Sequence, residues 1–193
     1  MAPKRRSYYE ATTPPKSRFS YEAIRPRSHD DVYCVLDTNI HMECKPFGEI
    51  DWLDVLDAKK IFLLIPSPVV EELDNHKENN PRKNKRSRAQ RAIKDLARTQ
   101  DRMPSGGDGL VRQNVFLRFL PPPPFQHAAI IGPTDNDGRI LASALVFKDD
   151  TGITPMVMTA DLNMRLRATA FELSVKQLAR PNDLFYSDDG DEL

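Results

Sequence analysis

Four carboxylates, those of Asp37, Glu72, Asp137 and Asp161, occupy positions that suit a divalent cation site. Asp37 and Asp161 directly follow apolar, strand-like runs, whereas Glu72 and Asp137 fall in the first turns of helix-like segments. Clustered carboxylates raise one another's pKa unless a cation neutralises them. Oxygen ligands without Cys or His favour Mg²⁺ or Mn²⁺ over Zn²⁺. Two such ions can activate water against a phosphodiester bond.

The elements that must position these acids follow from the apolar pattern. The runs at 31–36 (DVYCVL) and 61–65 (IFLLI) do not alternate with polar residues, which predicts strands buried on both faces. Further strands are expected at 110–120, 156–160 and 171–175, helices at 51–58, 67–79, 87–99, 136–147 and 162–168, and a loop at 121–134. Strands that alternate with helices predict an α/β fold with a parallel sheet and helices on both faces.

Such a fold would bring the four acids to one edge of the sheet, because ligands of parallel sheets bind beyond the carboxyl ends of the strands. Asp137 stands three, four and seven residues before apolar residues of its helix, so it heads the core-facing stripe, a poor place for an unpaired charge. On the preceding helix, Glu71 projects away from the buried face. Glu72 and Asp74 lie about equally close to that face, and helical phase does not decide between them.

Each acid also suits an ordinary structural role. Asp37 in DTN and Asp161 in TADLN fit turn or N-cap positions, Glu72 fits a solvated helix position, and Asp137 is a charge that a helix amino end favours. The matched placement of all four favours a shared site over four separate roles.

The chain carries no sign of a membrane or secreted protein. No apolar run approaches the roughly 20 residues that span a bilayer. The basic N-terminal segment is not followed by the apolar stretch of a secretory signal. Cys34 and Cys44 lack metal-ligand spacing and are typical of reduced cysteines in an intracellular, cytoplasmic protein.

The formal net charge of zero conceals a segregation of charge. Residues 1–27 hold seven Lys and Arg against two Glu, and residues 77–102 hold ten against three acidic residues. We interpret the chain as an irregular basic arm (1–29), one domain (30–180) with a basic helical insert (77–102), and an acidic tail (181–193). An acidic body with basic appendages suits a protein that holds cations and grips a polyanion, although basic runs can also be merely solvated.

Four strings, in this order, make the chain similar to a known family: VLDTNI (35–40), PSPVVEELDNHK (66–77), NDGRILASAL (136–145) and VMTADLNMRLRA (157–168). Over about residues 31–178 the chain resembles the PIN-domain nucleases. The resemblance implies a Rossmann-like three-layer fold with a central parallel sheet. It also implies that the family's four acidic positions are Asp37, Glu72 (rather than Asp74), Asp137 and Asp161, and that these bind Mg²⁺ or Mn²⁺.

Other polar residues match the family less specifically. Asn39 and Thr159 match positions that often line the site, and Asn163 lies near it, but turn and capping roles explain them equally well. The basic insert resembles that of PIN modules ahead of PhoH-type ATPases and of related stand-alone proteins. The chain has no G-x-x-x-x-G-K-[ST] motif, so no ATPase is expected with it. It is also longer than typical toxin-type PIN proteins, which argues against a simple toxin–antitoxin role.

The basic residues that follow the Glu72 helix are expected to bind backbone phosphates, with an affinity that falls steeply with salt. They are Arg82, Lys83, Lys85, Arg86, Arg88 and Arg91. Aromatic residues also interleave with basic ones in the arm. Packing onto the domain or a partner subunit explains Tyr8, Tyr9, Phe19 and Tyr21 better than stacking on a nucleic acid strand does.

These observations predict a Mg²⁺- or Mn²⁺-dependent endoribonuclease that acts on single-stranded RNA and leaves 5′-phosphate and 3′-hydroxyl ends. A non-catalytic module that binds nucleic acid or protein and a DNA nuclease with the same metal chemistry are the alternatives. Phosphotransfer through Asp37 is disfavoured because the DxD pair is missing. A second copy or a regulatory protein stays open as a partner. The histidines occupy loop or surface contexts and none is expected to be catalytic: His29, His41, His76 and His127.

Overall fold

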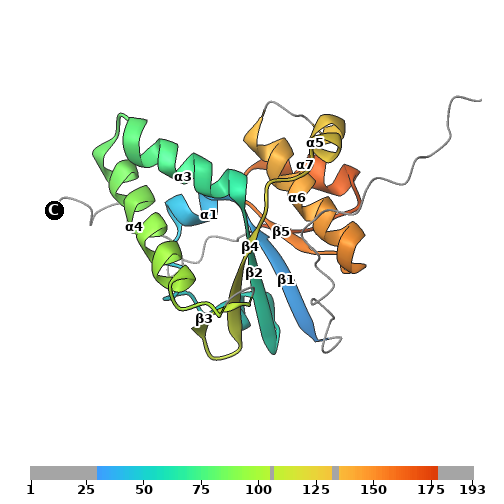
Figure 1. Ribbon diagram of the computed structural model, residues 1–193, viewed down its shortest axis with the longest axis horizontal. Coiled ribbons are helices and arrows are strands. Elements are labelled where there is room, and N and C mark those ends of the chain that lie inside the picture. The colour runs from blue at the N-terminus through green and yellow to red at the C-terminus, as the bar shows by residue number, and fades with distance from the viewer. Residues whose placement is uncertain (1–29, 105–106, 132–134, 178–193) are drawn as a thin grey trace, which may run out of the picture.

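The computed structural model describes residues 30–104, 107–131 and 135–177 (Figure 1). The basic arm at 1–29, with its aromatic residues and His29, and the acidic tail at 181–193 lie outside the described residues. The domain boundaries therefore stay predictions. Within the described ranges, every helix is too short or too polar to cross a bilayer.

A six-stranded, mostly parallel sheet forms the centre of the fold. The strands are β1 (Asp31–Leu36), β2 (Lys60–Pro66), β3 (Gly109–Arg112), β4 (Val115–Leu120), β5 (Met156–Met158) and β6 (Ser174–Lys176). Their order across the sheet is β3-β4-β2-β1-β5-β6, and every neighbouring pair is parallel except β3 with β4. The predicted α/β fold is confirmed, with one antiparallel edge strand added to the expected parallel sheet.

The two central strands are apolar because helices cover both of their faces. The last four residues of β1 and the last six of β2 are buried, as their continuous apolar runs predict. Val35 of β1 stands beside Leu64 of β2, and both are fully buried. At about 25 cal/mol per Å² of buried apolar surface, these strands supply much of the driving force for folding.

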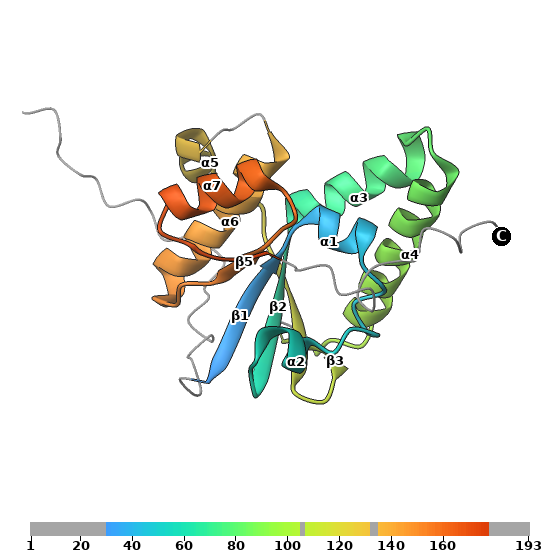
Figure 2. The same cartoon turned by 180° about the vertical axis from the view of Figure 1, so that it is seen from behind.

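Seven helices flank the sheet in the described residues. They are α1 (Thr38–Glu43), α2 (Trp52–Leu56), α3 (Ser67–Asn79), α4 (Lys83–Gln100), α5 (Phe125–Ile131), α6 (Asn136–Thr151) and α7 (Leu162–Ala170). Figures 1 and 2 show α1, α3 and α4 gathered on one side of the strands' carboxyl ends and α5, α6 and α7 on the other. Three of these helices, α1, α3 and α7, begin within four residues of the end of a parallel strand.

The region between the basic insert and α6 differs from the prediction. Residues 110–120 are not one strand but the β3–β4 hairpin, because Asn114 adopts a left-handed conformation (φ 61°) in a two-residue turn. The predicted loop at 121–134 contains α5. The last strand begins at Ser174 rather than at residue 171, since Glu172 also has a positive φ (56°) in the turn after α7.

The basic insert is half of a helical hairpin formed by α3 and α4. Helix α4 begins at Lys83, four residues before the predicted start. Pro81 cannot continue α3, and the Asn80 side chain accepts a hydrogen bond from the Arg82 N–H (3.0 Å), which closes the turn between the helices. The basic residues from Lys83 onward therefore belong to one helix, and Arg82 is its N-cap.

Candidate functional site

Asp37 lies at the end of β1 and is almost completely buried, with 2% of its surface exposed. Its backbone N–H donates to the Met158 carbonyl at the end of β5 (3.1 Å), which fixes it at the carboxyl edge of the sheet. Asn39 donates to its Oδ2 atom (3.2 Å) from the first turn of α1. Burial raises the pKa of Asp37 to about 6, and the nearby charges of Asp137 and Glu72 add to that rise.

Thr159 connects two of the four acids. Its fully buried hydroxyl donates to Asp37 Oδ2 (2.7 Å) and accepts from the Asp161 N–H (3.0 Å). The hydrogen bond from Thr159 partly offsets the rise in the pKa of Asp37. Asp161 is the N-cap of α7 and accepts from the Met164 N–H (2.8 Å), so the capping role considered from the sequence is present. Strand β5 ends at Met158 and α7 begins at Leu162, so Thr159 and Asp161 lie in the short loop between them at the carboxyl end of β5.

Glu72 stands in the second turn of α3 and reaches toward α1. Its Oε2 atom accepts a hydrogen bond from the Thr38 hydroxyl (2.8 Å), and its Oε1 atom lies 3.8 Å from Nε2 of His76. Asp74 instead pairs with Lys77 on the same helix (2.7 Å) and is about half exposed. Glu72, unlike Asp74, therefore contacts Thr38, the residue that follows Asp37 in the chain.

Asp137, in the first turn of α6, links the remaining acids electrostatically. Burial raises its pKa, and so do the charges of Asp161, Glu72 and Asp135, while Arg167 opposes the rise. Asp37 in turn interacts with Asp137 and Glu72. The four acids from β1, α3, α6 and the start of α7 therefore converge on one end of the sheet. Asn163 is an exposed residue of α7 and makes no hydrogen bond to these acids in the described part of the chain.

The chemistry of this cluster fits a hard divalent cation. The hydrogen bonds that the Asp37 carboxylate receives come from neutral donors, namely the side chains of Thr159 and Asn39 and the backbone N–H of Thr38. No Lys or Arg in the described residues forms an ion pair with it. A buried carboxylate surrounded by other carboxylates lacks positive charge, which Mg²⁺ or Mn²⁺ would supply. Among the described residues, no group of three or more His, Cys, Asp or Glu side chains is tight enough to hold a metal ion. The four acids therefore do not form a complete set of metal ligands in this arrangement.

Two ion pairs flank the cluster and were not predicted from the sequence. Arg139 of α6 binds Glu71 of α3 through two hydrogen bonds (2.7 and 2.9 Å). Arg167 of α7 binds Asp135, the N-cap of α6 (2.9 Å). Burial tends to raise the pKa of Asp135, but Arg167 and the Gly138 N–H hold it below its ordinary value. The sequence gives only a weak signal for these pairs, namely that Glu71 precedes Glu72 directly and that Asp135 stands two residues before Asp137.

The six basic residues of the insert divide into two groups. Arg82 and Lys83 are exposed, and Lys85 is half-buried. Arg86 donates to the carbonyl of Asn80 (2.6 Å), which supports the α3–α4 turn, and Arg88 donates to a carbonyl of α1 (3.4 Å). Arg91 is exposed and lines a small pocket. Arg86, Arg88 and Arg91 therefore already make interactions within the protein.

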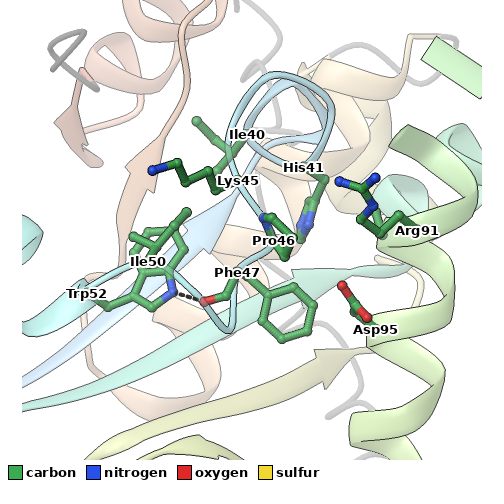
Figure 3. A pocket seen from close by; sticks show the side chains of 10 residues that line it. Ile40, His41, Lys45, Pro46, Phe47, Ile50, Trp52, Arg91 and Asp95 are labelled. Carbon is green, nitrogen blue, oxygen red and sulfur yellow. Dashed lines mark hydrogen bonds between the residues drawn. The ribbon is translucent and has the colours of Figure 1, made fainter. Parts of the chain in front are cut away.

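Figure 3 shows that pocket, which lies between α1, the segment after it and α4. His41 lines it and is 6% exposed, so the expectation of a loop or surface context for this histidine is wrong. Burial lowers the pKa of His41 to about 4, which keeps the ring neutral near pH 7. Its Nε2 atom is buried without a hydrogen-bond partner among the described residues. The pocket contains none of the four clustered acids.

The chain is similar in sequence pattern to one protein family and in fold to several solved structures. The sequence pattern of the PIN domain matches residues 34–179. One similar solved structure is a domain of a functionally unknown protein from Methanocaldococcus jannaschii DSM 2661, with a TM-score of 0.48 and 18% identity over 78% of this chain and 93% of that one. Another is VapBC2 from Rickettsia felis bound to a DNA fragment from its promoter, with a TM-score of 0.44 and 15% identity over 76% of this chain and 98% of that one. No curated protein sequence matches significantly.

Proposed function

The chain belongs to the PIN domain family, whose members are generally nucleases that use divalent metal ions, and we propose that it is a Mg²⁺- or Mn²⁺-dependent endoribonuclease acting on single-stranded RNA. One observation carries the proposal. Asp37 is a carboxylate with 2% exposure, its pKa is raised to about 6 by burial and by neighbouring acids, and its hydrogen-bond donors are neutral. Such an arrangement is costly for a protein unless a cation occupies it.

In this proposal Asp37, Glu72, Asp137 and Asp161 hold the cation. When held by these residues, a divalent cation would supply Lewis-acid activation of water and of the phosphodiester. Thr159 and Asn39 fix the rotamer of Asp37 through their hydrogen bonds to Oδ2, and Thr38 fixes that of Glu72. In-line attack by water on phosphorus, with departure of the 3′ oxygen, leaves 5′-phosphate and 3′-hydroxyl ends. No histidine is required for the proton transfers.

The RNA strand would be held by exposed and half-buried basic side chains at and just before the start of α4. Arg82, Lys83 and Lys85 remain the best candidates for phosphate contacts, since Arg86 and Arg88 already contact backbone carbonyls of the fold. Several cations at the start of one helix suit recognition of the phosphate backbone, which carries no sequence information.

The test compares two acids between which helical phase alone does not decide. Wild type, Glu72→Gln and Asp74→Asn are incubated with labelled single-stranded RNA and single-stranded DNA in Mg²⁺, in Mn²⁺ and in EDTA. We expect cleavage of RNA by wild type and Asp74→Asn, its loss in EDTA, and at least a hundredfold slower cleavage by Glu72→Gln. Preferred cleavage of DNA would assign the same chemistry to a DNA nuclease. Binding to RNA without cleavage in any metal would favour a non-catalytic module.

A further inference from the structure

The first turn of α6 is held from both sides by arginine pairs that join it to other helices. On one side, Arg139 forms its bidentate pair with Glu71, the residue before Glu72 on α3. On the other, Arg167 of α7 contacts both oxygens of Asp135 (2.9 and 3.3 Å) and also the Ile131 carbonyl of α5 (2.9 Å). Figures 1 and 2 both show the amino ends of α3 and α6 side by side above the strands.

These pairs oppose a repulsion that the site itself creates. Glu72 and Asp137 come from α3 and α6, and each charge makes the other less favourable. The same holds for Asp137 and Asp161, which come from α6 and the start of α7. Before a cation is bound, this repulsion pushes the three helix ends apart. The Arg139–Glu71 pair stands one residue from Glu72 and two residues from Asp137. Asp135 also stands two residues from Asp137, and its partner Arg167 ties it to the last turn of α7, the helix that Asp161 caps.

We propose that Arg139 and Arg167 are positioning residues, which hold α3 and α7 against the first turn of α6 and thereby set the spacing of Glu72, Asp137 and Asp161 for the cation. The inference rests on the proposed function, because the two arginines can position metal ligands only if the four acids bind a metal ion. Neither arginine touches the RNA or the cation in this proposal.

A purely stabilising role predicts a different outcome from a positioning role. Arg139 and Glu71 are partly exposed, with 27% and 51% of their side-chain surfaces accessible, and exposed ion pairs contribute little to folding stability. Partners that orient metal ligands, in contrast, commonly change metal affinity by tenfold to a hundredfold when they are removed. The pair is therefore expected to affect cation affinity more than the melting temperature of the metal-free protein.

Arg139 gives the cleaner test of the two. Arg167 is close enough to Asp137 to lower its pKa directly, so replacing it changes the charge at the site as well as the spacing. The matched control is Lys77→Gln, which breaks the Lys77–Asp74 pair on α3. That pair has the same 2.7 Å length as the shorter Arg139–Glu71 contact but lies within a single helix.

The experiment measures Mn²⁺ affinity by calorimetry and the melting temperature in EDTA. The proteins are wild type, Arg139→Gln, Lys77→Gln and the charge-swapped double variant Glu71→Arg with Arg139→Glu. We expect Arg139→Gln to bind Mn²⁺ about tenfold more weakly, with a melting temperature within about 4 °C of wild type. Lys77→Gln is expected to bind as wild type does, and the swapped pair to recover most of the affinity.

The outcomes separate this inference from the proposed function. Unchanged Mn²⁺ affinity in Arg139→Gln overturns the positioning role while leaving the nuclease proposal intact. A large fall in melting temperature that parallels the loss of affinity, without recovery in the swapped variant, assigns Arg139 to stability alone and also overturns it. Wild type that binds no Mn²⁺ removes the basis of both proposals.

Discussion

Replacing Asp37 with Asn is expected to stabilise the metal-free protein at neutral pH. Burial raises the pKa of Asp37 from an ordinary value of 3.8 to about 6 in the folded state. The unfolded chain therefore releases this proton at a lower pH than the folded chain does. Folding stability falls as the pH rises from 3.8 to 6, and the loss persists above that range. A shift of this size corresponds to about 3 kcal/mol at pH 7.5, which the neutral Asn side chain avoids.

The assay is urea unfolding of wild type and Asp37→Asn in EDTA, at pH 7.5 and at pH 4. The free energy of unfolding of the variant is expected to exceed that of wild type by about 1–3 kcal/mol at pH 7.5, since the Asn side chain keeps the Thr159 hydrogen bond imperfectly. The difference should shrink to a few tenths at pH 4, where both side chains are neutral. Saturating Mn²⁺ should stabilise wild type more than the variant. A variant that is less stable than wild type at pH 7.5 in EDTA would refute the idea that the site is a strained cluster of negative charge.

Three further predictions follow from the same contacts. Neutralising Arg82, Lys83 and Lys85 with Gln is expected to flatten the slope of log affinity against log salt for single-stranded RNA by about 2, measured by fluorescence anisotropy; an unchanged slope would exclude phosphate contacts there. Wild type is expected to lose up to about 3 kcal/mol of stability relative to His41→Leu as the pH falls from 6.5 to 4, because the His41 ring takes up a proton in the unfolded chain at a higher pH than in the fold. Parallel pH profiles of the two proteins in urea unfolding would contradict this. Thr159→Val should lower cleavage activity and destabilise the fold by about 1–3 kcal/mol, whereas Thr159→Ser keeps the hydroxyl and should be milder; equal effects of the two would show that the hydroxyl is unimportant.

Much of the sheet could be predicted because its central strands are encoded by continuous apolar runs. Apart from Asp31 at the start of the first one, the strands at 31–36 and 61–65 place apolar or aromatic side chains on both faces, the pattern of strands in the centre of a parallel sheet. The placement of Asp37 at the carboxyl edge of the sheet follows from the strand at 31–36, and that of Asp161 follows from the strand expected at 156–160. Asp137 is half-buried in the first turn of α6, whereas Asp135 is exposed, which agrees with their helical phases.

Features that depend on tertiary contacts could not be predicted. Short helices such as α1 and α5, with six and seven residues, are held by packing and not by their own propensity. The β3–β4 turn rests on one left-handed Asn114, and the pattern around it reads as a continuous strand. Helical phase did not separate Glu72 from Asp74, and only the family resemblance favoured Glu72, because the contact that distinguishes it comes from Thr38 on another helix. The hydrogen bond of Arg86 within the fold depends on where the α3–α4 turn brings the Asn80 carbonyl. A linear pattern of charges carries no information on which of them find such partners.

The most direct test of the central claim is the cleavage of labelled single-stranded RNA by wild type and by Asp37→Asn, in Mn²⁺ and in EDTA, with analysis of the product ends. Wild type in Mn²⁺ is predicted to release fragments with 5′-phosphate and 3′-hydroxyl ends. Neither wild type in EDTA nor the folded Asp37→Asn variant in Mn²⁺ should release them. Cleavage that persists in EDTA or in Asp37→Asn, or products that end in a 2′,3′-cyclic phosphate, would contradict a metal-dependent hydrolysis centred on Asp37.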